Sequence, residues 1–252
     1  MSTDVRPGVD AWANEPLVGR TAIVTGGARG LGAALTRELV AAGARVAVLD
    51  VRDELADELV AELPDGAARR FTADLADAER IATVAVEVED TFGSVDVLVN
   101  NAGVDLTAPF PELTPQDWDR ILGVNLRAPA LMARAVWPAM RRAGGGRIVN
   151  IISTAAKRAW ANAAAYHATK WGLLGLSHAL HVEGRDAGIV VSAVVAGGMR
   201  TPFLFERFPD LDPDLLQEPS AVARAVRFVL ESPAGTVVPE MLVLPTKETS
   251  WP

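Results

Sequence analysis

A strand-forming run that ends directly in a glycine-rich turn is the feature of this sequence that most constrains its fold. The segment TAIVTG (21–26) is short and β-branched, and GARGLG follows it before a helical pattern begins at Gly30. Leucines with helical spacing then continue toward Ala42. A strand, a turn of glycines and a helix in immediate succession form the first half of a unit in which crossover helices join parallel strands. The chain is therefore predicted to begin an α/β fold at about residue 20.

The same alternation continues along the rest of the chain. Strands are predicted at 45–50, 68–72, 95–103, 147–153, 189–196 and 241–244, and helices at 53–63, 77–92, 114–142, 163–186 and 220–231. The 114–142 segment reads as one long helix or as a broken pair. RVAVLD and IVVSAVVA are apolar almost throughout, which is typical of strands buried on both faces. We therefore expect a parallel sheet with helices on both of its faces.

The chain is predicted to form one domain, over residues 19–252, because no repeat, low-complexity stretch or Pro/Gly-rich linker divides it. Residues 1–18 mix Pro, Gly, Asp and Asn without periodicity and are expected to form a flexible tail. Residues 197–218 are apolar but irregular, and three prolines interrupt them. A long irregular segment in a compact domain is often a lid over a site, and two short surface helices are the alternative.

Composition limits the classes of partner. The 252 residues carry a formal net charge of −8, whereas nucleic-acid binding requires clustered Lys and Arg, so no nucleic-acid partner is expected. The absence of cysteine excludes disulfides and thiolate sites. His178 and His181 share a helix face but read more simply as ordinary helix residues, so no metal is expected. The sequence has neither a signal-peptide core nor an apolar run of the roughly 18 residues that a membrane span needs, which predicts a soluble, cytoplasmic protein without a membrane partner.

The glycine-rich turn has the form of a dinucleotide-binding site. Its glycines allow the backbone to approach a pyrophosphate, and the helix that follows directs its N-terminus at that negative charge. The next strand ends at Asp50, where a carboxylate accepts hydrogen bonds from ribose hydroxyls and repels a 2′-phosphate. This favours NAD over NADP, although Asp50 also suits a helix N-cap. Arg29 in the turn is the competing feature, because its charge can pair with a 2′-phosphate.

Two further segments follow strands at the edge where α/β sheets bind ligands. Asp74-Leu75 follows the third strand, and Asp74 is a candidate for the adenine. Asn100-Asn101-Ala102-Gly103 follows the fourth strand and is a candidate for the adenosine side. Asn and Gly are also common after strands for reasons of turn geometry alone, so a structural role competes closely.

A serine, a tyrosine and a lysine suggest acid–base chemistry. Ser153 ends the fifth predicted strand, and the helix after it carries Tyr166 and Lys170, whose spacing of four places them on one face. A tyrosine pKa near 10 is high for a base at neutral pH, and a neighbouring ammonium favours the phenolate and lowers that pKa. Tyr and Lys four residues apart are usually coincidental, but coincidence is hard to maintain beside Ser153 and a dinucleotide turn.

In this order and spacing, the pieces resemble the short-chain dehydrogenase/reductase family in its compact single-domain branch. The resemblance covers about residues 18–245 and rests on TGGARGLG (25–32), Asp50, Asp74-Leu75, NNAG (100–103), Asn125 within VNL, Ser153 and Tyr166-His-Ala-Thr-Lys170. It implies a single-domain Rossmann-like fold, with a doubly wound seven-stranded parallel sheet. It also implies NAD(H)-dependent hydride transfer between nicotinamide and a secondary alcohol or ketone.

The resemblance implies a role for each matching residue. Ser153 holds the substrate oxygen, Tyr166 donates or accepts the proton, and Lys170 lowers the Tyr166 pKa and binds the nicotinamide ribose. Asn125 helps a water complete a proton relay; apart from the family pattern it reads only as a polar turn in the long helix. The residues expected to hold the cofactor are Gly26, Arg29, Gly30, Leu31, Gly32, Asp50, Asp74, Leu75, Asn101, Ala102, Gly103, Tyr166, Lys170, Gly197 and Thr201.

The sequence departs from the family pattern after the sixth strand. Ala196 stands where proline is usual, which is expected to loosen the turn before the lid. Gly197 keeps the close backbone approach, and Thr201 lies where the family often bonds the nicotinamide carboxamide. We expect cofactor binding to survive this change.

The substrate is only weakly indicated. Trp160 and two lid residues, Phe203 and Phe205, suggest an apolar or ring-containing substrate, while Lys157 and Arg158 read as solvated. The tail 246–252, with Trp251, is a candidate for packing at a subunit interface or over a neighbouring active site.

Two other functions compete with alcohol or ketone oxidoreduction. One is a redox-neutral isomerase or dehydratase reaction on the same scaffold, and the other is a non-catalytic dinucleotide sensor, which would usually lack Tyr or Lys. The resemblance further implies a homodimer or homotetramer, in which the helices of 114–142 and 163–186 form a bundle. Close contact there would use alanines that also suit an internal core, namely Ala128, Ala130, Ala133 and Ala135.

Overall fold

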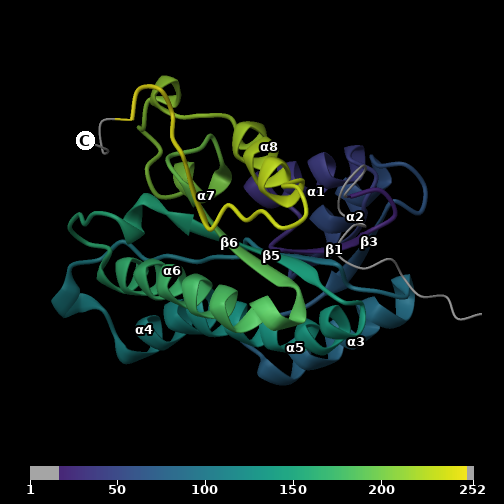
Figure 1. Ribbon diagram of the computed structural model, residues 1–252. Coiled ribbons are helices and arrows are strands. Elements are labelled where there is room, and N and C mark those ends of the chain that lie inside the picture. Colours follow the sequence, from purple (N-terminus) through teal and green to yellow (C-terminus); the bar gives the residue numbers. More distant parts are fainter. Residues whose placement is uncertain (1–16, 249–252) are drawn as a thin grey trace, which may run out of the picture.

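The computed structural model describes residues 17–248, which form a seven-stranded sheet between two layers of helices (Figure 1). The strands are β1 Thr21–Thr25, β2 Arg45–Asp50, β3 Ala68–Thr72, β4 Val97–Asn100, β5 Gly146–Ser153, β6 Ile189–Ala196 and β7 Glu240–Val243. Their order is β3-β2-β1-β4-β5-β6-β7, and every neighbouring pair is parallel. The predicted doubly wound parallel sheet is thereby confirmed.

The helices lie where the leucine and valine periodicity predicts them, within a few residues. They are α1 Gly30–Ala41, α2 Asp53–Ala61, α3 Ala78–Phe92, α4 Pro115–Leu122, α5 Ala128–Arg142, α6 Ala164–Gly184, α7 Pro202–Phe205 and α8 Pro219–Leu230. Local caps fix the ends of several helices. Asp77 accepts hydrogen bonds from the amides of Glu79 and Arg80 at the start of α3, and Gly93 closes that helix with φ of +81°.

Of the two alternatives for the segment 114–142, one long helix or a broken pair, the structure has the broken pair. Helices α4 and α5 are joined by a π-helical stretch, Gly123–Arg127, in which the amide of Ala128 bonds to the carbonyl of Gly123. Such π-helical insertions are frequent at functional sites. The stretch contains Asn125, whose side chain it directs into the protein interior.

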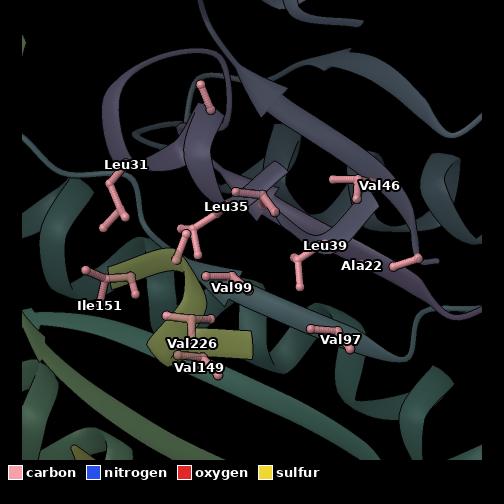
Figure 2. Packing of buried hydrophobic residues seen from close by; sticks show 14 of the residues in the cluster. Ala22, Leu31, Leu35, Leu39, Val46, Val97, Val99, Val149, Ile151 and Val226 are labelled. Atoms are coloured by element: carbon pink, nitrogen blue, oxygen red, sulfur yellow. The ribbon is translucent and has the colours of Figure 1, made fainter. Parts of the chain in front are cut away.

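Two layers of core explain the uniform apolarity of the strands. Ala22 and Val24 of β1 pack with α1 and α8 on one face, whereas Ile23 packs with α3 and α5 on the other. Figure 2 shows the first of these clusters, with Leu35 and Leu39 of α1 among strand side chains. Leu17, within the predicted tail, is also buried in this cluster, so the folded domain begins before residue 19. Residues 1–16 of that tail lie outside the described residues.

The order of the strands places a ligand-binding edge at the centre of the sheet. The chain moves outward from β1 to β2 and β3, then returns to β4 on the other side of β1. The loops after β1 and β4 therefore diverge, which opens a crevice at the carboxyl ends of the strands. Between Leu17 and Glu248, no helix is long and apolar enough to cross a bilayer.

Candidate active site

A single cavity of about 1310 Å³ opens at the carboxyl ends of the strands and reaches from the glycine-rich turn to the lid. The expected cofactor and catalytic residues that line it are Gly26, Arg29, Gly30, Leu31, Gly32, Asp50, Asp74, Leu75, Asn101, Ala102, Gly103, Ser153, Tyr166, Lys170, Gly197 and Thr201. Two expected substrate residues, Trp160 and Phe203, line it as well. Phe205 and Asn125 are not among its lining residues.

The glycine-rich turn fits a dinucleotide because it has no room for side chains. A Cβ on Gly32 would lie 1.9 Å from the carbonyl oxygen of Gly26, and one on Gly26 would lie 2.9 Å from the Cα of Ala102. Gly26 and Gly30 also have φ of +60° and +55°. Among residues 17–248 no side chain caps the start of α1, and the first turn of this helix contains no acidic residue. The N-terminus of α1 can therefore direct its free amides at a pyrophosphate.

Asp50 is buried at the end of β2, at the other side of this turn. Its Oδ2 accepts a hydrogen bond from the amide of Ala28 at 3.1 Å, and its Oδ1 accepts from the amides of Val51 and Arg52. These bonds fix the carboxylate beside the cavity. The Arg52 guanidinium lies 3.8 Å from Oδ1 and also lines the cavity. The sequence analysis did not single out this arginine, although it follows Asp50 by only two residues.

Arg29, the residue that competes with Asp50, bonds to the lid. Its guanidinium contacts both carboxylate oxygens of Glu206, at 2.5 and 3.3 Å. This ion pair holds the pKa of Glu206 below its usual value. The glycine turn and the lid are therefore joined across the cavity.

The two asparagines of the NNAG segment have different surroundings. Asn101 lines the cavity, and its Nδ2 donates to the carbonyls of Thr25 and Gly26, so it holds the glycine turn. Asn100 is buried instead, and its Nδ2 donates to Oδ1 of Asn150 at 2.8 Å. The expectation that Asn100 lines the adenosine side is therefore wrong, because successive strand side chains point to opposite faces of the sheet.

Ser153, Tyr166 and Lys170 meet at the inner end of the cavity. Ser153 ends β5 and accepts a hydrogen bond from the amide of Ala155, which leaves its hydroxyl proton to donate. Lys170 is buried, and its Nζ donates to the carbonyl of Ile151 at 2.9 Å and lies 5.6 Å from the centre of the Tyr166 ring. Tyr166 and Lys170 do share the predicted helix face.

The pKa values of Tyr166 and Lys170 differ from their ordinary values. Burial raises the pKa of Tyr166 to about 12, although hydrogen bonding to Ser153 acts to lower it. Burial also lowers the pKa of Lys170 to about 8. Loss of solvation thus acts against the charged form of both side chains, and the lowering of the Tyr166 pKa by Lys170 stays a prediction.

Asn125 holds the loop beside the reacting groups. Its Oδ1 accepts from the amide of Val104 at 2.8 Å, and its Nδ2 donates to the Val104 carbonyl at 2.7 Å and to Oγ1 of Thr169. Gly103 fits between this side chain and Lys170, since a Cβ there would lie 3.5 Å from Oδ1 and 4.0 Å from Nζ. Asn125 thus positions the segment that follows β4.

The predicted lid, residues 197–218, contributes apolar side chains to the lining of the cavity, including Leu204, Phe208 and Leu211. It contains α7 and a short 3₁₀ turn, Pro213–Leu215. At Ala196 the backbone is held on both sides: β6 pairs with β5 and β7, and the amide of Gly197 donates to the Val243 carbonyl at 2.9 Å.

Gly197 and Thr201 frame the start of the lid. A Cβ on Gly197 would lie 2.8 Å from Cδ of Pro245, so the close approach is to the segment after β7. Lys247 and Glu248 of that segment line the cavity, while Trp251 lies outside the described residues. Thr201 is buried, with its hydroxyl 3.4 Å from the Met199 carbonyl.

Three further residues of the site were missed by sequence reasoning. Asp105 and Arg207 line the cavity and form an ion pair, with Nε 3.9 Å from Oδ2. Asp105 follows NNAG by two residues, which was a usable signal, but nothing local links it to Arg207. His167, beside Tyr166, has an Nε2 that accepts the amide proton of Trp160 and an Nδ1 that bonds to the Ala155 carbonyl.

Comparison with known proteins agrees with this arrangement. A model of the short chain dehydrogenase family matches residues 20–212. The chain is 43% identical over 180 residues to a D-threitol dehydrogenase of Mycolicibacterium smegmatis, covering 71% of this chain and 69% of that protein.

Two solved structures of oxidoreductases are also similar to this chain over most of its length. A metagenomic short-chain oxidoreductase in complex with NADP is 36% identical with a TM-score of 0.81, over 91% of this chain and 98% of the other. A 3-ketoacyl-(acyl-carrier-protein) reductase from Brucella melitensis complexed with NADH is 30% identical with a TM-score of 0.84, over 92% and 99% of the two chains.

Proposed function

The chain belongs to the short-chain dehydrogenase/reductase family, and from that premise we propose how its own residues carry out the reaction. It is a nicotinamide-dependent oxidoreductase that acts on alcohols or ketones. The nicotinamide ring of the bound cofactor supplies or accepts the hydride. The observation that carries the residue assignment is the meeting of Ser153, Tyr166 and Lys170 at the inner end of the cavity that begins at the glycine turn.

In the reductive direction, the Tyr166 hydroxyl donates its proton to the substrate carbonyl oxygen, and in the oxidative direction it accepts the alcohol proton. A pKa of about 12 suits Tyr166 to proton donation, because the hydroxyl stays protonated at neutral pH. Ser153 donates a hydrogen bond to the same substrate oxygen. Lys170 presents its ammonium beside the Tyr166 ring, where it stabilises negative charge that develops on the phenolic oxygen.

Substitution of Tyr166 by Phe tests this assignment. The variant keeps the ring and loses the hydroxyl, so kcat/KM is expected to fall by about 10²-fold or more, while NADH binding by fluorescence stays close to wild type. Turnover at the wild-type rate would show that Tyr166 is not the acid. Consumption of substrate without net oxidation or reduction of the cofactor would instead indicate the redox-neutral alternative.

We propose NAD(H) as the physiological cofactor. Support comes from Asp50, whose buried carboxylate is fixed at the ribose end of the cavity, and from Arg29, whose charge is satisfied by Glu206. Arg52 is the cation best placed to oppose this choice, since it lies beside Asp50 and lines the cavity.

Fluorescence titration with NADH and NADPH tests the cofactor choice. NADH is expected to bind about tenfold more tightly, and Asp50→Ala to reduce that preference. Arg52→Leu serves as the matched variant. Tighter binding of NADPH that Arg52→Leu abolishes would assign Arg52 to the 2′-phosphate and overturn the choice of NAD.

We propose a cytoplasmic location, which localisation of a tagged full-length chain can test.

We also propose a homodimer or homotetramer, since α6 exposes Trp171 and Val182. Ala128 and Ala133 are buried in the chain's own core, so they are not free for contact with a partner. Light scattering of the wild type and of Trp171→Glu tests the assembly, and a monomeric wild type would contradict it.

A further inference from the structure

The inner wall of the cavity carries one pair of opposite charges close to the reacting groups. Asp105 lies on the loop after β4, and Arg207 lies on the lid just after α7. The Nε of Arg207 is 3.9 Å from Oδ2 of Asp105, and its Nη2 donates to the Asp105 carbonyl at 3.3 Å. The side chains are only 18% and 11% exposed, so both charges are largely shielded from bulk water.

Each member of the pair is positioned mainly by contacts other than the ion pair itself. Nη1 of Arg207 donates to the Phe203 carbonyl at 2.6 Å, and the guanidinium stacks 3.8 Å from the centre of the Phe203 ring. Oδ1 of Asp105 accepts from the Leu106 amide at 2.8 Å. The ion pair is long and is not the bidentate arrangement that makes Arg–carboxylate pairs strong. The two groups therefore retain hydrogen-bonding capacity toward the cavity that both of them line.

Stability alone accounts poorly for such a pair. Removing two charges from water costs several kcal/mol, and a long ion pair does not recover that cost well. The cost is visible in Asp105, where burial raises the pKa of the carboxyl group and Arg207 is the main opposing influence. Shielded charges with incomplete partners are common where a ligand supplies the remaining hydrogen bonds.

The pair lies within reach of the proton-transferring group. The ring of Phe203 is 6.3 Å from the ring of Tyr166, and Arg207 stacks on that same Phe203. The pKa of Tyr166 also responds to both charges, since Asp105 raises it and Arg207 lowers it. Tyr166, Asp105 and Arg207 all line the same cavity, so a substrate bound at Tyr166 shares that cavity with the pair.

We propose that Asp105 and Arg207 form a second polar recognition point for the substrate and select neutral molecules that carry a further hydroxyl group close to the reacting carbon, as in polyols and hydroxyketones. A hydroxyl group donates to the Asp105 carboxylate and accepts from the Arg207 guanidinium at the same time. A carboxylate at this point would be repelled by Asp105, and an ammonium group by Arg207. A plain alkyl chain would leave the remaining hydrogen-bonding capacity of both groups unsatisfied, a mismatch that binding sites reject.

This inference rests on the proposed function and refines its substrate. The apolar or ring-containing substrate predicted from Trp160 and the lid would match the apolar lining residues such as Leu204 and Phe208, whereas Asp105 and Arg207 add a polar point to the same cavity. The chain is 43% identical to a protein named D-threitol dehydrogenase, and threitol is a polyol. This similarity agrees with the inference but is not its basis.

The test compares 2,3-butanediol with 2-butanol, which differ by one hydroxyl group next to the reacting carbon, and adds 3-hydroxybutyrate as an anion. We expect wild-type kcat/KM with NAD to favour one stereoisomer of the diol over 2-butanol by about tenfold or more. Arg207→Met keeps the aliphatic stem on Phe203 but removes the donors, and Asp105→Asn keeps the size of the side chain but removes its charge. Both variants are expected to bring the ratio of the two kcat/KM values close to one.

Arg200→Met is the matched control. Arg200 lies on the same lid, but it bonds to Glu218 and to the Pro213 carbonyl and does not line the cavity. It should preserve the ratio. Because a ratio is independent of the fraction of folded enzyme, partial misfolding of a variant does not obscure the result.

Three outcomes would overturn the inference. They are a wild-type preference for 2-butanol, a diol preference that survives both substitutions, and a preference for 3-hydroxybutyrate that only Arg207→Met abolishes. The last would make Arg207 an anion site. No turnover of any substrate by a protein that binds NADH would instead refute the proposed function, and the inference with it.

Discussion

Arg29 of the glycine turn and Glu206 of the lid bond to each other across the mouth of the cavity, with both guanidinium Nη atoms on the carboxylate. Their side chains are 27% and 58% exposed. Ion pairs between side chains this exposed contribute little to stability, and less at high salt. We propose that this weak contact closes the predicted lid reversibly over a cofactor.

Glu206→Gln should accelerate cofactor release, because it removes one charge from that contact. We expect the NADH dissociation rate, measured by stopped-flow fluorescence, to rise up to about fivefold at low salt and less at high salt. Glu218→Gln is the control, since Glu218 pairs with Arg200 elsewhere on the lid. Equal rates in the wild type and both variants would show that the pair does not close the lid.

Tyr166 should titrate well above ordinary tyrosine. It is the only tyrosine of the chain, so tyrosinate absorbance reports this residue alone. Burial raises its pKa to about 12, and we therefore expect almost no tyrosinate in the folded protein at about pH 10, where a free tyrosine is half ionised. Unfolding in urea should restore a midpoint near 10. A folded-state midpoint at or below 10 would contradict the dominance of burial.

Lys170→Met should stabilise the protein at neutral pH although it removes a proposed catalytic group. The lysine pKa falls from 10.5 in the unfolded chain to about 8 on folding, a loss of about 3 kcal/mol while the group is charged. The variant also loses the hydrogen bond from Lys170 to the Ile151 carbonyl, which lowers its stability by about 1 kcal/mol. The variant should thus exceed the wild type by about 2 kcal/mol in the free energy of unfolding at pH 7.

The sign of the pH dependence follows from the direction of that shift. Between about pH 8 and 10.5 the unfolded state binds the Lys170 proton and the folded state does not, so wild-type stability rises with pH relative to the variant. Urea unfolding at about pH 7 and about pH 9.5 should show the advantage of the variant shrinking. An advantage that stays constant or grows would mean that Lys170 keeps its ordinary pKa.

His167→Gln should disturb the loop between Ala155 and Trp160, which leads from β5 to α6, and should leave the fold largely intact. The imidazole joins the Ala155 carbonyl to the Trp160 amide, with distances of 2.8 and 3.1 Å, and its ring contacts the Trp160 ring edge-on. Glutamine cannot satisfy both bonds from one side-chain position. We expect a loss of about 2 kcal/mol in stability and a rise in substrate KM that exceeds the change in kcat.

The matched variant for this test is His178→Gln on the exposed side of the same helix, where the histidine faces Glu240. It should leave the substrate KM unchanged. Similar KM values for both variants would remove His167 from the positioning of the loop.

Most of the fold could be predicted because its signals are local. Most of the strands are short apolar runs. Asp77 and Gly93 cap the two ends of α3 through bonds to residues of that same helix. The Tyr166–Lys170 face likewise depends only on helical spacing. Asn100 was wrongly predicted to line the cavity. Alternate strand residues point to opposite faces of the sheet, and the sequence alone does not tell which of two neighbouring residues points toward the cavity.

The parts of the site that could not be predicted depend on tertiary contact or on burial. Asp105 and Arg207 lie 102 residues apart in the chain, and no pattern in either segment refers to the other. The effect of burial on the Tyr166 pKa could not be inferred from the sequence for a related reason. Coulombic attraction to Lys170 can be inferred from spacing, whereas the larger cost of desolvation depends on everything that surrounds the ring.

The π-helical stretch at Gly123–Arg127 makes the chain sensitive to the deletion of a single residue. A π-helical turn is an α-helix with one residue inserted, so losing any one residue there allows α4 and α5 to join as a regular helix. Successive residues of an α-helix are rotated by about 100° about the helix axis. The deletion would therefore rotate Asn125 away from Val104, or would rotate α4 on the protein surface. The spacing between α4 and the site is thus set by a residue count, and the loop that carries Asp105 depends on that count.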